Sequence, residues 1–137
     1  MKKILFVFIV FFLSLTFAQT QKYDQTKITT LLQTALDKQF IPGRELIVQL
    51  VELQPNTKLE RHWHPGEEFH YYLEGEVEIK IGDSTYIGKP GMVGHVPYKA
   101  IHTATALDKG AKILVFRVHS EGEPMRYPAD STSNNHK

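Results

Sequence analysis

The sequence predicts an all-β domain folded as a sandwich or a barrel. Across residues 76–81, apolar and charged side chains alternate with a period of two, which is typical of a strand with one buried and one wet face. Residues 44–53 are rich in apolar and β-branched types and are long enough for a buried strand. Turn-forming residues separate such runs at short intervals, and a chain of 137 residues suits one compact domain.

The remaining strands follow from the positions of the turns. Pro55-Asn56 marks a turn after the first buried strand, and Gly82-Asp83 joins residues 76–81 to residues 84–87 as a hairpin. Asp108-Lys109-Gly110 predicts a further turn near the end of the domain. Additional short strands are expected at residues 93–96, 102–107 and 111–119.

Residues 28–40 fit two different structures. The apolar residues of this segment have the spacing of a helix: Ile28, Leu31, Leu32, Ala35 and Leu36. The β-branched pair Thr29-Thr30 favours a strand instead. Periodicity alone favours the helix by a narrow margin, and Pro42-Gly43 ends whichever element forms.

Residues 1–18 have the pattern of a secretory signal peptide. Lys2 and Lys3 precede an apolar run, and the small residues Thr16 and Ala18 occupy the positions expected before a cleavage site. The run is too short for a permanent membrane span, which needs about 20 apolar residues. We therefore expect an exported protein, periplasmic or secreted, that is not attached to a membrane after cleavage.

The mature chain excludes several functions by its composition. Without Lys2 and Lys3 the formal net charge changes from +1 to −1, and a near-neutral chain without a basic run is a poor nucleic-acid binder. The absence of cysteine rules out disulfides, thiol chemistry and cysteine-ligated zinc. Residues 19–27 are expected to form a lead-in to the domain, and residues 122–137 a polar tail.

Histidine and glutamate residues concentrate in one short stretch. His62 and His64 would share one face of a strand, and the turn Pro65-Gly66 would let Glu68 reach the same point. Two imidazoles and a carboxylate can hold a transition metal ion and leave positions open for water, oxygen or substrate. Imidazole suits Zn, Cu, Fe and Ni, and the added carboxylate also admits Mn.

This stretch resembles the first motif of the cupin superfamily. The resemblance rests on residues 62–68, which read HWHPGEE, on Gly75, and downstream on Gly91, Pro97 and His102, which have the spacing of the second motif. It implies a double-stranded β-helix, or jelly-roll, barrel over residues 28–121 with one divalent metal ion inside. It also implies the metal ligands, which would be His62, His64, Glu68 and His102.

The resemblance also bears on the open points. Similar single-domain cupins begin with an edge strand, so residues 28–34 are expected to be a strand rather than a helix. The motifs usually have glycine where this chain has Asn56 and Lys99, and asparagine at the place of Ala106. Asn56 tolerates the same turn geometry. Lys99 is either a cation that steers an anionic substrate or, more simply, a solvated turn residue.

Two more residues on the ligand face are candidate catalytic residues. His70 lies two positions after Glu68 and could be a base, a proton shuttle or an extra ligand, but equally a hydrogen-bonded core histidine. Tyr72 follows on the same face and is either a hydrogen-bond donor to substrate or a filler of the core. Of the remaining residues, Trp63 is expected to pack, Glu67 to lie on the surface, and His95 to play a structural role or line the cavity. His119 and His136 are expected to face solvent.

Three functions remain open from the sequence. The first is a metal-dependent dioxygenase or isomerase acting on a small organic substrate, with Fe, Mn, Zn, Ni or Cu as the metal ion. The second is a non-catalytic barrel that binds a small molecule or a sugar, and the third is a structural barrel stabilised by its ion. Edge strands of such a barrel often pair between subunits, so a homodimer is also compatible with the sequence.

Overall fold

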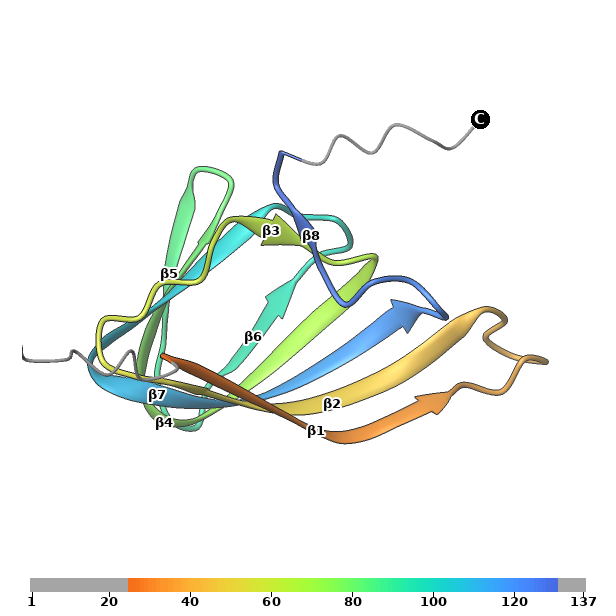
Figure 1. Ribbon diagram of the computed structural model, residues 1–137, viewed down its shortest axis with the longest axis horizontal. Helices are drawn as coiled ribbons and strands as arrows, with labels where there is room; N and C mark the ends of the chain where they lie inside the picture. The colour runs from red at the N-terminus through yellow and green to blue at the C-terminus, as the bar shows by residue number, and fades with distance from the viewer. Residues whose placement is uncertain (1–24, 131–137) are drawn as a thin grey trace, which may run out of the picture.

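The computed structural model describes residues 25–130, which form eight strands of one curled antiparallel sheet (Figure 1). The strands are β1 (Thr26–Ala35), β2 (Arg44–Leu53), β3 (His62–Trp63), β4 (Gly66–Ile81), β5 (Ser84–Gly88), β6 (Val93–Val96), β7 (His102–Ser120) and β8 (Tyr127–Pro128). The all-β prediction is confirmed, and the curled sheet is consistent with a jelly-roll barrel. The proposed signal peptide lies outside the described residues.

The long strands β4 and β7 hold the barrel together. β4 pairs with β7 along most of its length, with β6 near its start and with β5 near its end. The β4–β7 register shifts between Tyr72 and Glu74 and again between Gly75 and Val77. The set of β4 positions whose side chains face inward therefore changes at this point. Gly75 has a φ of 69°, and a Cβ there would lie 1.9 Å from the carbonyl oxygen of Gly110, so only glycine fits.

The segment that fitted both a helix and a strand, at the start of the domain, is a strand, as the resemblance implied. β1 pairs with β2 along its length, and the helix favoured by periodicity is absent. A bulge between Thr30 and Leu32 explains the misleading pattern, because one extra residue breaks the period of two. Ile28 pairs with Val51, which faces inward, whereas Leu32 pairs with Val48 on the opposite face. Four-residue spacing therefore arose here without a helix.

Both turn residues that replace the motif glycines adopt left-handed backbone conformations. Asn56 has a φ of 59° and Lys99 a φ of 57°, which explains why glycine is usual at these positions. The Lys99 ammonium lies 5.5 Å from the centre of the Trp63 ring and 5.3 Å from that of Tyr98. Lys99 is thus a turn residue whose cation contacts two aromatic faces.

The apolar core lies on the inner face of the curled sheet, mainly beside the second half of β4 and the first half of β7. Its buried members are Val51, Leu53, Tyr72, Val77, Ile79, Ala104, Ala106, Ala111, Ile113 and Val115. After β7 the chain returns across the barrel, and β8 pairs with β3 (Figure 1). In the part of the chain that the structure describes, no helix has the length and apolarity needed to cross a membrane.

Candidate metal centre

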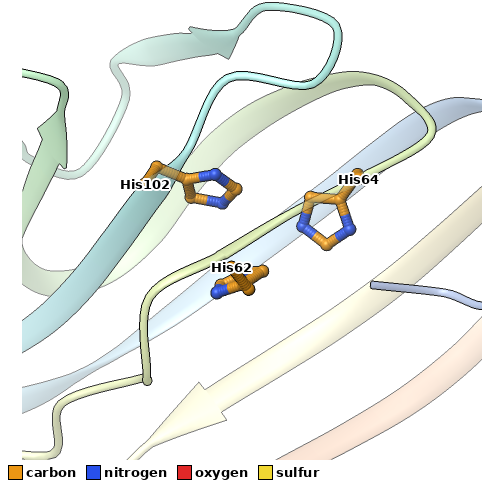
Figure 2. Close-up of side chains that lie close together, drawn as sticks. All are labelled: His62, His64 and His102. Atoms are coloured by element: carbon orange, nitrogen blue, oxygen red, sulfur yellow. The ribbon is translucent and has the colours of Figure 1, made fainter. Parts of the chain in front are cut away.

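Three histidines from two segments distant in the sequence meet inside the barrel (Figure 2). His62 lies on β3 and His102 at the start of β7, and the two are direct partners across the β3–β7 pairing. His64 follows β3 by one residue. One ligand atom from each ring lies within 4.8 Å of the others, and the three residues are only 3 to 6% exposed. The sequence analysis expected these three residues to meet, and the structure places them together.

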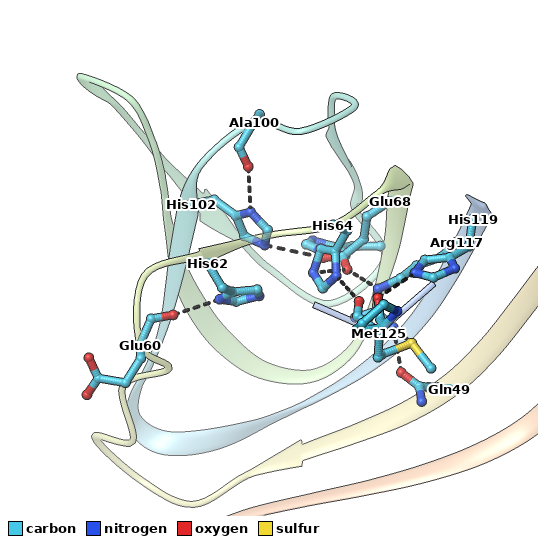
Figure 3. A network of polar contacts seen from close by, with 12 residues as sticks. Gln49, Glu60, His62, His64, Glu68, Ala100, His102, Arg117, His119 and Met125 are labelled. Atoms are coloured by element: carbon cyan, nitrogen blue, oxygen red, sulfur yellow. Dashed lines mark hydrogen bonds and ion pairs between the residues drawn. The ribbon is translucent and has the colours of Figure 1, made fainter. Parts of the chain in front are cut away.

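Each of the three rings is oriented by a backbone carbonyl. Nδ1 lies 2.7 Å from the Glu60 oxygen in His62, 2.6 Å from the Met125 oxygen in His64, and 3.0 Å from the Ala100 oxygen in His102 (Figure 3). A carbonyl can only accept a hydrogen bond, so each Nδ1 carries the proton. Each Nε2 is therefore left with a lone pair, which is the form of imidazole that binds a metal ion.

Burial keeps the rings of His62 and His102 in this neutral form. Burial lowers the pKa of His62 to about 4, and the neighbouring His102 and His64 act in the same direction, against the Glu60 carbonyl that raises it. Burial likewise lowers the pKa of His102. Near neutral pH these two lone pairs are therefore available to a ligand rather than blocked by protons.

Nε2 of His64 is a buried polar atom that a divalent cation would satisfy. It is buried and has no hydrogen-bond partner among the described residues. It lies 3.0 Å from the Glu68 carboxylate, but with the proton on Nδ1 it has no hydrogen to donate there. Two electron-rich atoms facing each other in a buried site are unfavourable unless a cation lies nearby. The nitrogen and oxygen donors present fit a divalent transition metal ion.

Glu68 is buried beside the three histidines but is also held from its other side. One oxygen lies 3.8 Å from Nε2 of His102, the other accepts a hydrogen bond of 2.5 Å from Nε of Arg117, and His70 also contacts the carboxylate. Burial alone would raise the pKa of Glu68, but the Arg117 guanidinium and His70 hold it well below its ordinary value. Glu68 is thus an ionised group at the site, and its role as fourth ligand stays a prediction.

His70 and Tyr72 continue the network away from the histidine cluster. Nδ1 of His70 lies 3.1 Å from the Tyr72 hydroxyl, and its Nε2 contacts Glu68. Burial raises the pKa of Tyr72 to about 12, with the negative charge of Glu68 acting in the same direction, so the hydroxyl stays protonated. The hydrogen bonds therefore run in one direction, from the Tyr72 hydroxyl to His70 and from His70 to Glu68. Catalytic roles for both residues stay predictions.

Sequence reasoning missed Arg117 and misplaced His119. Arg117 is buried and also donates from Nη1 to the side-chain oxygen of Gln49 at 2.5 Å (Figure 3). His119, expected to face solvent, is fully buried, with its Nδ1 2.9 Å from the Ser120 oxygen and its Nε2 3.2 Å from the Pro124 oxygen. Both lie on the inward face of β7 with Ile113 and Val115.

Residues 121–130, called here the C-terminal strap, cover the site from one side. The Met125 carbonyl orients His64 across 61 sequence positions. Tyr127 stacks on Trp63 with ring centres 4.3 Å apart, so Trp63 packs as expected. Glu67 is exposed, as expected, and its carboxylate lies 2.7 Å from Nε2 of His95. The His95 ring also stacks on Phe69.

A cavity of about 540 Å³ opens between β5 and β6, and its lining includes none of the three clustered histidines. Its lining is mostly apolar and includes Ile79, Ile81, Ile87, Met92 and Gly94. Ile81 is the strand partner of His102, and Gly94 is the partner of His70. A Cβ at Gly94 would lie 2.7 Å from the Tyr72 hydroxyl, so glycine at this position makes room for that hydroxyl at the cavity wall.

Comparison with known proteins agrees with this architecture. Residues 49–119 match the Cupin_2 family, described as a cupin domain. The SPbeta prophage-derived uncharacterized protein YoqG of Bacillus subtilis (strain 168) is 36% identical over 58 residues, which cover 40% of this chain and 68% of that protein.

Solved structures show the same fold at low identity. A cupin superfamily protein from Desulfitobacterium hafniense DCB-2 is 20% identical with a TM-score of 0.60, over 71% of this chain and 80% of that one. A conserved protein of unknown function from Streptococcus pyogenes is 25% identical with a TM-score of 0.59, over 73% and 79%. The DMSP lyase DddQ from Ruegeria pomeroyi DSS-3 is 20% identical with a TM-score of 0.64, over 80% of this chain and 54% of that one.

Proposed function

The chain belongs to the Cupin_2 domain family, and we propose that its three-histidine cluster binds one divalent transition metal ion inside the barrel. One observation carries the proposal: three buried imidazoles have each Nδ1 turned to a carbonyl, which leaves three Nε2 atoms facing one another. The donor set accepts Fe, Mn, Zn, Ni or Cu. Glu68 would be the fourth ligand or would neutralise part of the charge of the ion.

We further propose that the barrel is a metal-dependent enzyme for a small organic substrate. A bound ion would supply Lewis acidity toward a substrate oxygen and, if redox-active, activation of dioxygen. The cavity between β5 and β6 is large enough for a small molecule and lies next to the strand partners of His102 and His70. Its apolar lining would bind the carbon skeleton and exclude water.

The buried hydrogen-bond chain favours proton transfer, as in an isomerase. The Tyr72 hydroxyl lies beside Gly94, which lines the cavity, and donates toward His70, which contacts the ionised Glu68. A substrate hydroxyl would donate to the Tyr72 oxygen, whose own proton would pass to Nδ1 of His70. Glu68 would stabilise the imidazolium that forms. A dioxygenase would use the same pocket but would not need this hydrogen-bond chain.

Elemental analysis of natively purified protein tests the metal site. We expect about one transition metal ion per chain in the wild type and in His95→Ala, the matched control on the outer surface. His62→Ala and His102→Ala should lose the ion, because each removes a ligand. A wild type free of metal, or both variants with full metal content, would contradict the proposal.

Two assays on the metal-loaded protein separate the candidate reactions. Deuterium exchange from solvent into a keto acid or a diketone, abolished by His70→Ala at unchanged metal content, would support the isomerase. Oxygen uptake on adding a flavonol or a diketone would support the dioxygenase instead. Binding of such molecules without turnover would support the non-catalytic barrel and overturn the enzyme proposal.

Export stays a proposal that rests on residues 1–18. Mass spectrometry of the protein from its native host should find an N-terminus at Gln19, without the preceding segment. An intact N-terminus in the cell interior would overturn it.

A further inference from the structure

The C-terminal strap contacts the barrel next to the histidine cluster. β8 belongs to the strap and pairs with β3, which places Pro128 opposite His62. Earlier in the strap, the Met125 carbonyl accepts a hydrogen bond of 2.6 Å from Nδ1 of His64. The strap therefore contacts two of the three clustered histidines, one through strand pairing and one through a hydrogen bond to its ring.

His119 is a buried anchor for this strap that the proposed chemistry does not use. Its side chain is fully buried near the end of β7, and its Nε2 lies 3.2 Å from the carbonyl oxygen of Pro124. A carbonyl can only accept a hydrogen bond, so this contact requires a hydrogen on Nε2. Pro124 immediately precedes Met125 in the chain. His119 thus holds the strap one peptide unit before the carbonyl that orients His64.

The His119 ring is fixed by contacts with two neighbouring strands. On β2, its strand partner Glu45 is buried, and one oxygen of that carboxylate lies 3.5 Å from Nδ1 of His119. The other Glu45 oxygen accepts a hydrogen bond of 2.9 Å from Gln33 on β1. On β4, a Cβ at Gly66 would lie 2.7 Å from the Cα of His119, so the two backbones approach closely there. A ring held in this way presents its Nε2 at a defined position.

Arg117 contacts the same part of the strap. Its Nη1 lies 3.8 Å from the sulfur of Met125, and its Nε donates to Glu68, so one side chain links the strap to the cluster (Figure 3). A thioether sulfur is a weak acceptor, whereas the Pro124 carbonyl is a strong one. The hydrogen bond from His119 is therefore the stronger of these two side-chain contacts to the strap.

We propose that His119 is a positioning residue of the metal site: it fixes Pro124 and thereby keeps the Met125 carbonyl where it orients His64. The inference rests on the proposed metal site. Groups that orient a metal-binding histidine raise metal affinity, and a backbone carbonyl can do so only if its segment is held in place. By the reciprocity of coupled equilibria, the ion in turn stabilises the strap against the barrel.

Two substitutions of similar length and volume separate positioning from packing. His119→Gln keeps an N–H donor about as far from the backbone as Nε2, whereas His119→Met has no donor. Competition with a zinc chelator should show a Zn²⁺ affinity about tenfold weaker in His119→Met and within about twofold of the wild type in His119→Gln. Equal affinity in the wild type and His119→Met, or equal losses in both variants, would overturn the inference alone. A wild type that binds no Zn²⁺ would overturn the metal site as well.

Limited trypsin digestion of the metal-free chain measures the strap without the ion. Arg126 is exposed, and cleavage after it releases residues 127–137, which mass spectrometry detects. His119→Met should be cut there about fivefold faster than His119→Gln, the equivalent of one net hydrogen bond. In the wild type, Zn²⁺ should slow this cleavage. Equal cleavage rates in the two variants would overturn the strap contact even if Zn²⁺ binds.

Far-UV circular dichroism should be unchanged in both variants, which keeps a loss of folding distinct from a loss of the strap contact. If His119→Met does not fold, His119→Asn takes its place, because its amide reaches only about as far as Nδ1 and ends short of Pro124. The same loss of Zn²⁺ affinity and the same faster cleavage are expected of it, and their absence would overturn the inference.

Discussion

The two halves of β4 have opposite polarity. In residues 66–73 the inward side chains are Glu68, His70 and Tyr72, and the outward ones after Glu67 are exposed and apolar. In residues 76–81 the inward side chains are Val77 and Ile79, and the outward ones are charged. The register shifts on either side of Gly75 separate the halves and change which positions face inward.

This difference shows that only one half of the barrel is built for stability alone. Inward apolar residues in the second half gain free energy by leaving water, as in any core. Inward charged residues in the first half cost free energy unless they are paired, hydrogen-bonded or bound to an ion. The polar inward residues of the first half therefore suit a bound ligand inside the barrel.

The largest contrast should appear when matched residues of the two halves are truncated. We expect Ile79→Ala to lower the free energy of unfolding by about 2–5 kcal/mol, because it leaves a cavity in the core. Leu73→Ala should change it by less than about 1 kcal/mol, because the side chain is largely exposed. Urea denaturation of both variants measures this, and equal losses would erase the distinction.

Removing the charge that faces Glu68 should have the next largest effect. Arg117→Met leaves a buried carboxylate without its main partner, which should cost about 3–5 kcal/mol in the metal-free protein. Adding Glu68→Gln to this variant should recover part of the loss, since the remaining group is neutral. Urea denaturation with a chelator present provides the measurement, and a double variant no more stable than Arg117→Met would contradict the pairing.

Acid should weaken the metal-free protein through His62. Its pKa is about 4 when folded and about 6.5 when unfolded, so the unfolded state binds more protons between these values. Stability should fall by up to about 3 kcal/mol as the pH drops from about 6.5 to about 4. Urea midpoints across this range should show a smaller slope in His62→Gln, and an identical slope in both proteins would count against a neutral buried His62.

The smallest effect concerns the C-terminal strap. Tyr127→Ala removes the stack on Trp63 and loosens the strap whose Met125 carbonyl orients His64. We expect affinity for Zn²⁺ to fall by about tenfold, the lower range for partners that orient metal ligands. Tyr127→Phe keeps the ring and is the control, expected to retain affinity. Competition with a zinc chelator measures the Zn²⁺ affinity of both variants. An unchanged affinity in Tyr127→Ala would contradict a role of the strap in orienting His64.

Sequence alone predicted the strand and the histidine pair where the signal is local. The alternation across residues 76–81 identified its hairpin, and the spacing of His62 and His64 identified two members of the cluster, whereas His102 followed only from the cupin resemblance. The inward positions of β7 were not predictable in the same way. Leu114, Phe116 and Val118 are as apolar as the residues between them, so the pattern does not tell which face is inside. Arg117 and His119 were missed for this reason.

Other features lay beyond sequence reasoning because no side-chain pattern marks them. The carbonyl of Met125 orients His64 through the backbone, and any residue type could supply that oxygen. The bulge in β1 produced the spacing of a helix, and only the strand pairing with β2 resolves it.

The central claim is that a metal ion lies among the three histidines, and anomalous diffraction from crystals of natively purified protein tests it most directly. With data collected at the absorption edge of the metal that elemental analysis identifies, the account predicts one strong peak per chain, within bonding distance of Nε2 of His62, His64 and His102. A map without a peak there, or with the strongest peak held by other residues, would contradict it.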